Sequence, residues 1–288
     1  MNTNLKSLVE AAIADYVPPY SHQSLKQARA IKSIQIEGSS CLLEIELGYP
    51  LKTISATMVS QLRDLVLAVV GVEALELELA STVVAHKAQK NLKSLDAVRN
   101  IIAVASGKGG VGKSTTTVNL ALALAAEGAR VGVLDADIYG PSQGLILGIA
   151  PGVKPQPADN AMHPVIAHGI QVMSMSLLVD DDQPMVWRGP MASGALQQLL
   201  TQTLWDDLDY LFVDMPPGTG DIQLTLSQKA PLTGAVIVTT PQDIALLDAK
   251  KGIEMFRKVD VPVLGVVENM SLHICSQCGH SEPIFGEG

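Results

Sequence analysis

Apolar and polar residues follow two different periods in the first 80 residues of the chain. In "CLLEIELG" (residues 41–48) every second residue is apolar, with glutamates between, and "VEALELELA" (72–80) repeats this pattern. A period of two is typical of a half-buried β-strand. The segments 5–16 and 55–71 instead carry apolar residues at helical spacing. The pattern predicts a small α+β domain over residues 1–80, in the order α-β-β-α-β, with one sheet face in water.

The pattern changes after a polar, lysine-rich stretch, residues 81–99, which we interpret as a linker. From residue 100 onward short apolar runs appear without alternation: "IIAVAS", "RVGVLDAD", "IQVMSMS", "DYLFVD", "GAVIVTT" and "VPVLGVVEN". Helical patterns such as "TTTVNLALALAAEG" separate several of them. Continuous apolar strands between helices indicate a parallel sheet covered on both faces. The expected fold class of residues 100–288 is therefore α/β, a parallel doubly wound sheet whose chemistry lies beyond the carboxyl ends of its strands.

A phosphate-binding loop follows the first of these strands. The stretch "GKGGVGKS" (107–114) fits G-x-x-x-x-G-K-[ST] and stands between an apolar strand and a helix. Its glycines let successive N–H groups point at phosphate oxygens, and the helix N-terminus adds partial positive charge. An ordinary glycine-rich turn is the alternative, but the complete motif in this context disfavours it. The predicted nucleotide-binding residues of this loop are Gly107, Lys108, Gly109, Gly110, Val111, Gly112, Lys113, Ser114 and Thr115.

Carboxylates and one amide end the neighbouring strands. Asp135 and Asp137, in "LDADIYGPS", project to the same side of an extended strand end. Asp214 closes the apolar strand of "YLFVDMPPGTGD", where binding to a Mg²⁺ shell would offset the cost of desolvation. We predict that Ser114, Asp135 and Asp214 hold Mg²⁺, directly or through water, although turn or cap roles are alternatives for the aspartates. Asn269 offers a carboxamide to the edge of adenine, or caps the next element.

Two of the three cysteines, Cys275 and Cys278, stand together in "HICSQCGHSEP". No secretory leader is evident at the N-terminus, so a close pair is more often metal-binding or redox-active than a structural disulfide. A soft tetrahedral site needs about four ligands, and this segment supplies two thiols and uncertain candidates such as His280. The pair therefore leaves open either a shared metal centre or a zinc knuckle.

Composition argues against some classes of partner. The net charge of −9 argues against a nucleic-acid-binding surface over the whole molecule. No apolar run approaches the roughly 20 residues needed to span a bilayer. The expectation is a cytoplasmic protein with neither nucleic acid nor membrane as a partner.

The motifs together resemble one family. "ASGKGGVGKST", "DADIYGPS", "VWRGPM", "LDYLFVDMPPGTGD", "TTPQDIALLDAKKGIEMF" and "VVENMS" before a C-x-x-C are similar to the Mrp/ApbC (Nbp35-like) iron–sulfur cluster carrier ATPases. The resemblance implies a homodimer that hydrolyses ATP slowly, binds a labile 4Fe–4S cluster and passes it to apo-proteins. Lys108 resembles the extra lysine of the deviant Walker A loop in the MinD/ParA-like class, which implies an ATP-sandwich dimer in which it reaches the partner's nucleotide. Related ATPases link the second aspartate of the "DAD" pair, here Asp137, to water activation.

The resemblance also assigns the remaining roles. Catalysis would rest on Lys108, Lys113, Asp137 and Asp214. A two-fold interface presents each surface group twice, so Cys275 and Cys278 of two chains become four thiolates, the usual number for a 4Fe–4S cluster. The alternatives are a MinD/ParA-like spatial regulator and a zinc-stabilised regulatory ATPase.

The chain departs from the family pattern in two places. Residues 1–80 resemble the Mip18-like domain often fused in front of the ATPase, but "YVPPYSHQ" and "GYPLKTISATM" lack its Asp-Pro-Glu and Thr-x-x-Cys-Pro motifs. Cys41 lies in a predicted strand and does not replace the missing cysteine. We therefore expect a structural or interaction module that binds no cluster. The chain stops at "IFGEG", before further elements that are usual in the family.

Overall fold

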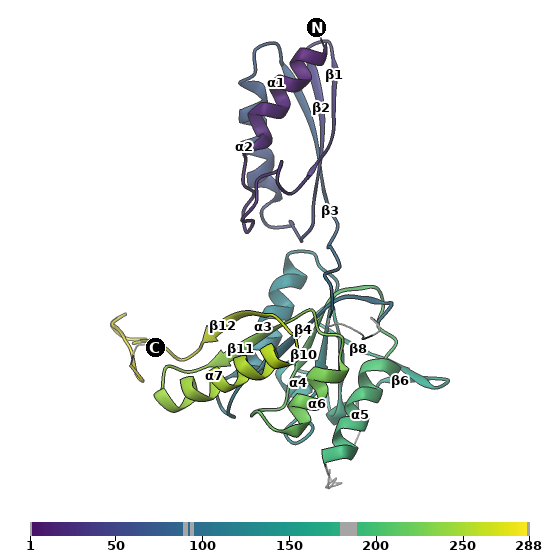
Figure 1. Cartoon of the computed structure of the whole chain (residues 1–288), viewed down its shortest axis with the longest axis vertical. Coiled ribbons are helices and arrows are strands. Elements are labelled where there is room, and N and C mark those ends of the chain that lie inside the picture. Colours follow the sequence, from purple (N-terminus) through teal and green to yellow (C-terminus); the bar gives the residue numbers. More distant parts are fainter. Residues whose placement is uncertain (1, 89–91, 93–94, 179–188, 287–288) are drawn as a thin grey trace. The chain divides into compact units, whose positions relative to one another are not determined.

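The computed structural model describes residues 2–88, 92, 95–178 and 189–286. Its contacts divide the chain into an N-terminal unit (residues 1–84 with 126–128) and a C-terminal unit (85–125 with 129–288). Figure 1 labels their elements.

The N-terminal unit has the predicted order of elements: α1 Asn2–Ala14, β1 Ile31–Glu37, β2 Ser40–Leu47, α2 Ser55–Leu67 and β3 Ala74–Ser81. Strand β2 pairs antiparallel with β1 and parallel with β3. The alternate apolar residues of β2, including Leu43 and Ile45, are buried and pack in one core with the apolar sides of both helices. Helix α2 ends at Leu67 rather than at residue 71, because two β-branched valines follow and Gly71 adopts a φ of 101°.

A seven-stranded sheet forms the centre of the C-terminal unit, in the order β12-β11-β4-β10-β5-β9-β8. All neighbouring strands run parallel except β8, which is antiparallel to β9. This arrangement confirms the predicted α/β class. The strands are β4 Val98–Ala105, β5 Val131–Asp135, β8 Val165–Ala167, β9 Ile170–Ser174, β10 Leu208–Asp214, β11 Gly234–Thr239 and β12 Val263–Glu268.

Strand β4 starts at Val98, so the last residues of the expected linker already belong to the central strand. Its successive side chains enter two different cores, with Ile101 and Ala103 on one face and Ile102 and Val104 on the other. Burial on both faces explains why this strand is apolar throughout and not alternating.

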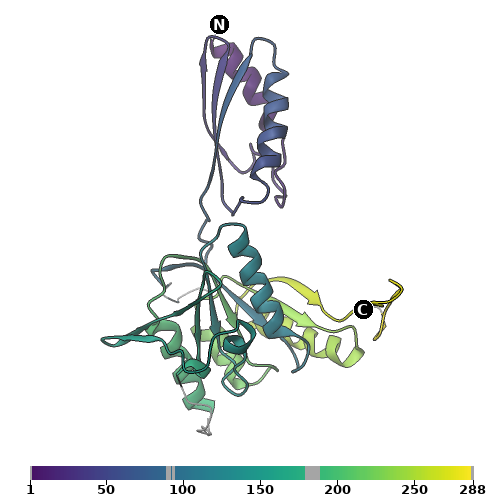
Figure 2. The same ribbon diagram turned by 180° about the vertical axis from the view of Figure 1, so that it is seen from behind.

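Helices cover both faces of the sheet. Figure 1 shows α5, α6 and α7 on one side, and Figure 2 shows α3, in teal, on the other. The two cores contain the matching helix residues, Leu196 of α5 and Phe256 of α7 in the first, Val118 and Ala121 of α3 in the second. The helices are α3 Lys113–Ala126, α4 Gln143–Ile146, α5 Gly189–Gln202, α6 Asp221–Lys229 and α7 Asp243–Lys258, with a 3-10 turn η1 Met175–Leu177.

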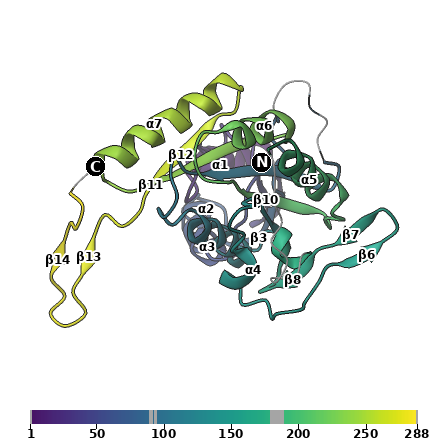
Figure 3. The same ribbon diagram turned by 90° about the horizontal axis from the view of Figure 1, so that it is seen from below.

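Two small antiparallel hairpins extend from this unit, as Figure 3 shows. The first pairs β6 Gln156–Ala158 with β7 Ala161–His163, and the second pairs β13 His273–Ile274 with β14 Ser281–Glu282 beyond the β12 edge. Among the described residues, no helix combines the length and apolar character that crossing a membrane requires.

Candidate nucleotide site and cysteine hairpin

The phosphate-loop motif spans the connection from β4 to α3. Two of its glycines, Gly110 and Gly112, adopt left-handed φ values of 79° and 85°. A Cβ on Gly112 would lie 2.2 Å from the side-chain nitrogen of Asn269. Glycine is therefore required at position 112 both by the backbone conformation and by the close contact.

The loop lysine is buried beside carboxylates. The ammonium nitrogen of Lys113 lies 2.5 Å from Oδ1 of Asp214, and these two side chains are 6% and 0% exposed. The same nitrogen lies 3.3 Å from the Ser114 hydroxyl and 3.9 Å from Oδ2 of Asp137. A single cationic group thus gathers oxygens from three side chains. Carboxylate and hydroxyl oxygens are hard ligands of the kind that Mg²⁺ prefers, usually together with phosphates of a nucleotide. The donor set therefore fits a magnesium–nucleotide complex.

Two residues that the sequence analysis did not identify also contact Asp214. Thr117 donates to its Oδ1 at 3.1 Å, and Gln143 Nε2 donates to its Oδ2 at 2.7 Å. Thr117 lies four residues after Lys113, so helical spacing in the sequence was a usable indication. Gln143 lies 71 residues from Asp214, and no local pattern predicts that proximity.

Asp135 lies beside Asp214, since the ends of β5 and β10 pair in register. Its Oδ2 accepts hydrogen bonds from the Ser142 and Gln143 amides at 2.9 and 3.0 Å, and from the Ser174 hydroxyl at 3.1 Å. Burial raises the pKa of Asp135 to about 6, although the hydrogen bonds from Gln143 and Ser174 act in the opposite direction. The carboxylate therefore shapes the loop after β5.

Asp137 has fewer partners. Its Oδ1 accepts from the Gly140 amide at 3.3 Å, and its Oδ2 faces the Lys113 ammonium. Burial raises the pKa of Asp137, while the charge of Lys113 lowers it. Fewer groups hold this carboxylate than hold Asp135, and one of its oxygens faces the lysine, which suits a group that orients a substrate.

The extra loop lysine and the strand-end asparagine each contact another element of the same chain. Lys108 donates to the side-chain oxygen of Gln242, just before α7, at 2.9 Å. Asn269 donates from Nδ2 to the Val111 carbonyl at 2.9 Å and accepts the Met270 amide at 3.0 Å. The asparagine thereby ties the end of β12 to the phosphate loop. Its contact with adenine stays a prediction, as does the reach of Lys108 to a partner.

The cysteine pair lies in the turn between β13 and β14. The Cys275 amide donates to the His280 carbonyl at 2.8 Å, and the Gly279 amide donates to the Cys275 carbonyl at 2.9 Å. Gly279 has a φ of 71°, a conformation that allows this tight turn. Amide hydrogen bonds lower the pKa of the Cys275 thiol, and the one from Cys278 has a larger effect than the one from Gln277.

Among the described residues, the pair belongs to no larger cluster of metal-ligating side chains. His280 lies 3.9 Å from Glu282. Across the described parts of the chain, no three His, Cys, Asp or Glu side chains cluster closely enough to hold a metal ion. Cys41 is buried in the core of the N-terminal unit, far from this hairpin in sequence.

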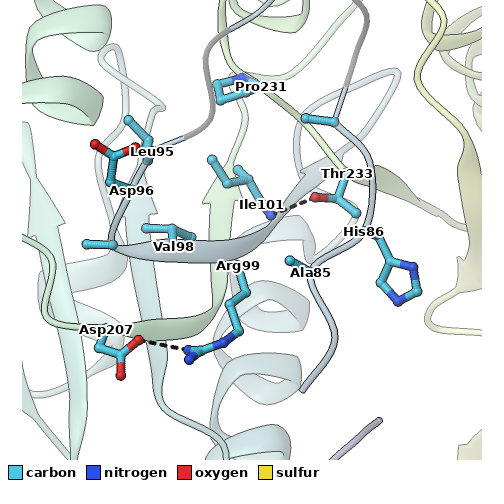
Figure 4. A pocket seen from close by; sticks show the side chains of 12 residues that line it. Ala85, His86, Leu95, Asp96, Val98, Arg99, Ile101, Asp207, Pro231 and Thr233 are labelled. Carbon is cyan, nitrogen blue, oxygen red and sulfur yellow. Dashed lines mark hydrogen bonds and ion pairs between the residues drawn. The ribbon is translucent and has the colours of Figure 1, made fainter. Parts of the chain in front are cut away.

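A cavity of about 310 Å³ lies at the opposite end of β4 from the phosphate loop (Figure 4). Arg99 in its wall donates to Asp207 at 2.8 Å and to Asp209 at 3.1 Å, and the Ile101 amide donates to Thr233. These polar groups are already paired with one another, and the predicted site residues do not line this cavity.

Comparison with known proteins decides the family. Residues 97–288 match the family described as "ParA: NUBPL iron-transfer P-loop NTPase". The chain belongs to this family of iron-transfer P-loop NTPases. Residues 6–77 match the family described as "FeS_assembly_P: Iron-sulfur cluster assembly protein". The predicted family resemblance is thereby confirmed for both parts of the chain.

Individual relatives of this NTPase agree. The "Iron-sulfur cluster carrier protein" of Pseudomonas fragi is 68% identical over 76% of this chain and 76% of its own length. The protein of the same name from Salmonella typhimurium is 52% identical over 99% of this chain and 77% of its own. A solved nucleotide-binding protein from Archaeoglobus fulgidus, in complex with ADP, is 43% identical with a TM-score of 0.60, covering 67% of this chain and 76% of that one.

In the structure of this chain, most of the motifs that resemble the family lie at one edge of the sheet. The loop 107–114, the "DAD" pair and Asp214 meet at the carboxyl ends of β4, β5 and β10. Residues 186–188 of "VWRGPM" lie outside the described residues.

Proposed function

We propose that this NTPase is an ATP-dependent carrier that holds a labile 4Fe–4S cluster and transfers it to apo-proteins. One observation carries the proposal: a single folded unit combines a buried lysine–aspartate phosphate site with a surface hairpin bearing two thiols. The relatives are named iron–sulfur cluster carrier proteins, which supports the cluster-carrying part of the proposal. The Archaeoglobus fulgidus protein is in complex with ADP, which supports the nucleotide-binding part.

Hydrolysis is proposed to rest on positioning and charge, as phosphoryl transfer requires. Lys113 exchanges its contact with Asp214 for the phosphate oxygens of ATP and neutralises their charge. Ser114, Asp135 and Asp214 would hold Mg²⁺, directly or through water, and the metal would neutralise charge on the phosphates. Asp137 orients the attacking water. Loop amides from residues 107–115 contact the phosphates, Asn269 faces the adenine, and Lys108 reaches the nucleotide of a second copy.

The cluster is proposed to be cargo held between two copies of the chain. Each copy supplies Cys275 and Cys278, and a two-fold axis turns two thiolates into the four that a 4Fe–4S cluster requires. The lowered pKa of the Cys275 thiol favours the thiolate, which is the form that binds metal. Because a shared centre depends on how two copies approach, nucleotide binding at the same dimer interface would couple to cluster loading or release.

The remaining assignments follow from the same proposal. Residues 1–80 form the Mip18-like domain, 81–99 a linker and 100–288 the ATPase, acting as a homodimer in the cytoplasm. Its partners are apo iron–sulfur proteins, and nucleic acid and membranes are not among them.

Anaerobic reconstitution with iron and sulfide tests the proposal. We expect charge-transfer absorbance, about four irons per dimer, and transfer to an apo-enzyme. Cys275→Ala or Cys278→Ala should abolish both cluster binding and transfer while nucleotide binding persists. One zinc per monomer after anaerobic purification, released by His280→Ala, would contradict the bridging cluster and favour a zinc-stabilised regulatory ATPase. Nucleotide binding and hydrolysis without any iron binding would favour a spatial regulator.

A further inference from the structure

A buried glutamine connects the two halves of the phosphate site. Gln143, the first residue of α4, is 0% exposed. Its Nε2 donates to Oδ2 of Asp214 at 2.7 Å and to the Ser114 carbonyl at 3.2 Å. Its backbone amide donates to Oδ2 of Asp135 at 3.0 Å. One residue therefore contacts both aspartates and the first turn of α3.

The hydrogen-bond partners fix the orientation of this carboxamide. The Asp214 carboxylate and the Ser114 carbonyl are both acceptors, so the amide nitrogen must face them and the oxygen must face elsewhere. Among the described residues, Oε1 of Gln143 then has no hydrogen-bond partner, although it is buried. A buried acceptor without a donor costs free energy. Space filling alone therefore does not account for a glutamine here, and the two hydrogen bonds that its amide nitrogen donates are the favourable contacts it makes.

The contacts of Asp214 indicate what the glutamine does. Lys113 and Thr117 donate to Oδ1, whereas Gln143 donates to Oδ2. When Lys113 turns to the phosphates, Oδ1 loses its strongest partner. Gln143 and Thr117 are then the contacts that keep the carboxylate in place.

We propose that Gln143 is a positioning residue for the magnesium–nucleotide complex, an inference that rests on the proposed nucleotide site. Its amide nitrogen holds Asp214 and the start of α3 in a fixed relation while Lys113 moves. Asp214 is a proposed ligand of Mg²⁺, so the position of its carboxylate decides how well the metal would be held. The residue thus links the affinity for nucleotide to the presence of the metal.

The test is the magnesium dependence of nucleotide binding. The dissociation constant of a fluorescent ADP analogue is measured on the full chain in Mg²⁺ and in EDTA, for the wild type and for Gln143→Met. We expect the ratio of the two affinities to fall by about ten-fold in the variant, since one hydrogen bond toward a charged group is lost. A modest fall in the melting temperature is expected as well, because Oδ2 of the buried Asp214 carboxylate loses its donor. Gln143→Leu repeats the measurement should the methionine variant fail to fold.

A second buried glutamine provides the matched control. Gln223, in α6, is 2% exposed and also has an unpartnered Oε1 among the described residues. It makes none of the Asp214 contacts described above. Gln223→Met should leave the magnesium ratio unchanged, and an equal fall in both variants would overturn the inference.

The outcomes separate the two proposals. If the wild type binds nucleotide more tightly in Mg²⁺ than in EDTA, and Gln143→Met shows the same ratio of affinities, the inference about Gln143 is wrong and the proposed function stands. A lower melting temperature with an unchanged ratio shows a structural role and overturns it too. A wild type without affinity for the nucleotide, with or without Mg²⁺, overturns both the inference and the proposed function.

Discussion

At the scale of single residues, the Lys113–Asp214 pair dominates the site. The two groups lie 2.5 Å apart and are almost fully buried. Each charge is tolerated there because the other is present, since an unpaired buried charge is strongly destabilising. The lysine therefore has two roles, neutralising Asp214 in the free protein and phosphate in the proposed complex.

Replacement of this lysine should show both roles. We expect Lys113→Ala to lower ATP turnover by at least about 100-fold, because a charge that stabilises the transition state is lost. It should also reduce the free energy of unfolding by about 3–5 kcal/mol, because Asp214 stays buried without a cation. Phosphate release and urea denaturation measure these effects. A variant as stable as the wild type would mean that the ion pair contributes little to stability.

Asp137 should separate binding from hydrolysis. Its carboxylate lies 3.9 Å from Lys113 and has few other partners, so its removal disturbs the loop less than removal of the lysine. We predict that Asp137→Ala keeps most of its nucleotide affinity and loses turnover, as seen by combining a fluorescent-nucleotide titration with phosphate release. Normal turnover in this variant would rule out the water-orienting role.

At the scale of elements, the phosphate loop depends on contacts with the residue that follows β12, Asn269. Gly112 has a φ of 85°, and a Cβ there would collide with Asn269. Gly112→Ala should therefore reduce the free energy of unfolding by about 1–3 kcal/mol through backbone strain alone. Gly109→Ala is the control, because a Cβ at Gly109 meets nothing within 4 Å. Urea denaturation that gives equal values for both variants would contradict this account.

The cysteine hairpin is a second element with a testable property. Amide hydrogen bonds favour the thiolate of Cys275, so the pKa of this thiol is lower than usual. In the metal-free protein, the rate at which iodoacetamide alkylates Cys275 should increase with pH. The pH at which this rate is half-maximal is the midpoint, and it should be lower in the folded protein than in the protein unfolded in urea. Mass spectrometry of the labelled peptide measures both midpoints. Identical midpoints would show that the folded turn has no effect on the thiol.

At the scale of the whole molecule, the thiol of the N-terminal unit offers a control for the location of the cluster. Cys41 is buried among the apolar residues of that unit. We expect Cys41→Ser to leave the iron content of the reconstituted protein unchanged, because all the proposed ligands lie in the β13–β14 hairpin. Iron and sulfide analysis measures this. A loss of about half the iron would place a second cluster in the N-terminal unit, contrary to our assignment.

The sequence by itself determined much of this protein. The apolar runs identified the parallel sheet because strands buried on both faces cannot alternate. The phosphate loop, the strand-end aspartates and the cysteine pair were each visible as local patterns, since their chemistry requires particular residue types at short spacing. These patterns also sufficed to identify the family.

Only the tertiary structure decided which distant residues meet. Gln143 reaches Asp214, Asn269 ties β12 to Val111, and Lys108 contacts Gln242 across 134 positions of sequence. The order of strands in the sheet brings these groups together, and that order is a property of long-range packing. A local pattern records the period and composition of a segment, but not its neighbours in space.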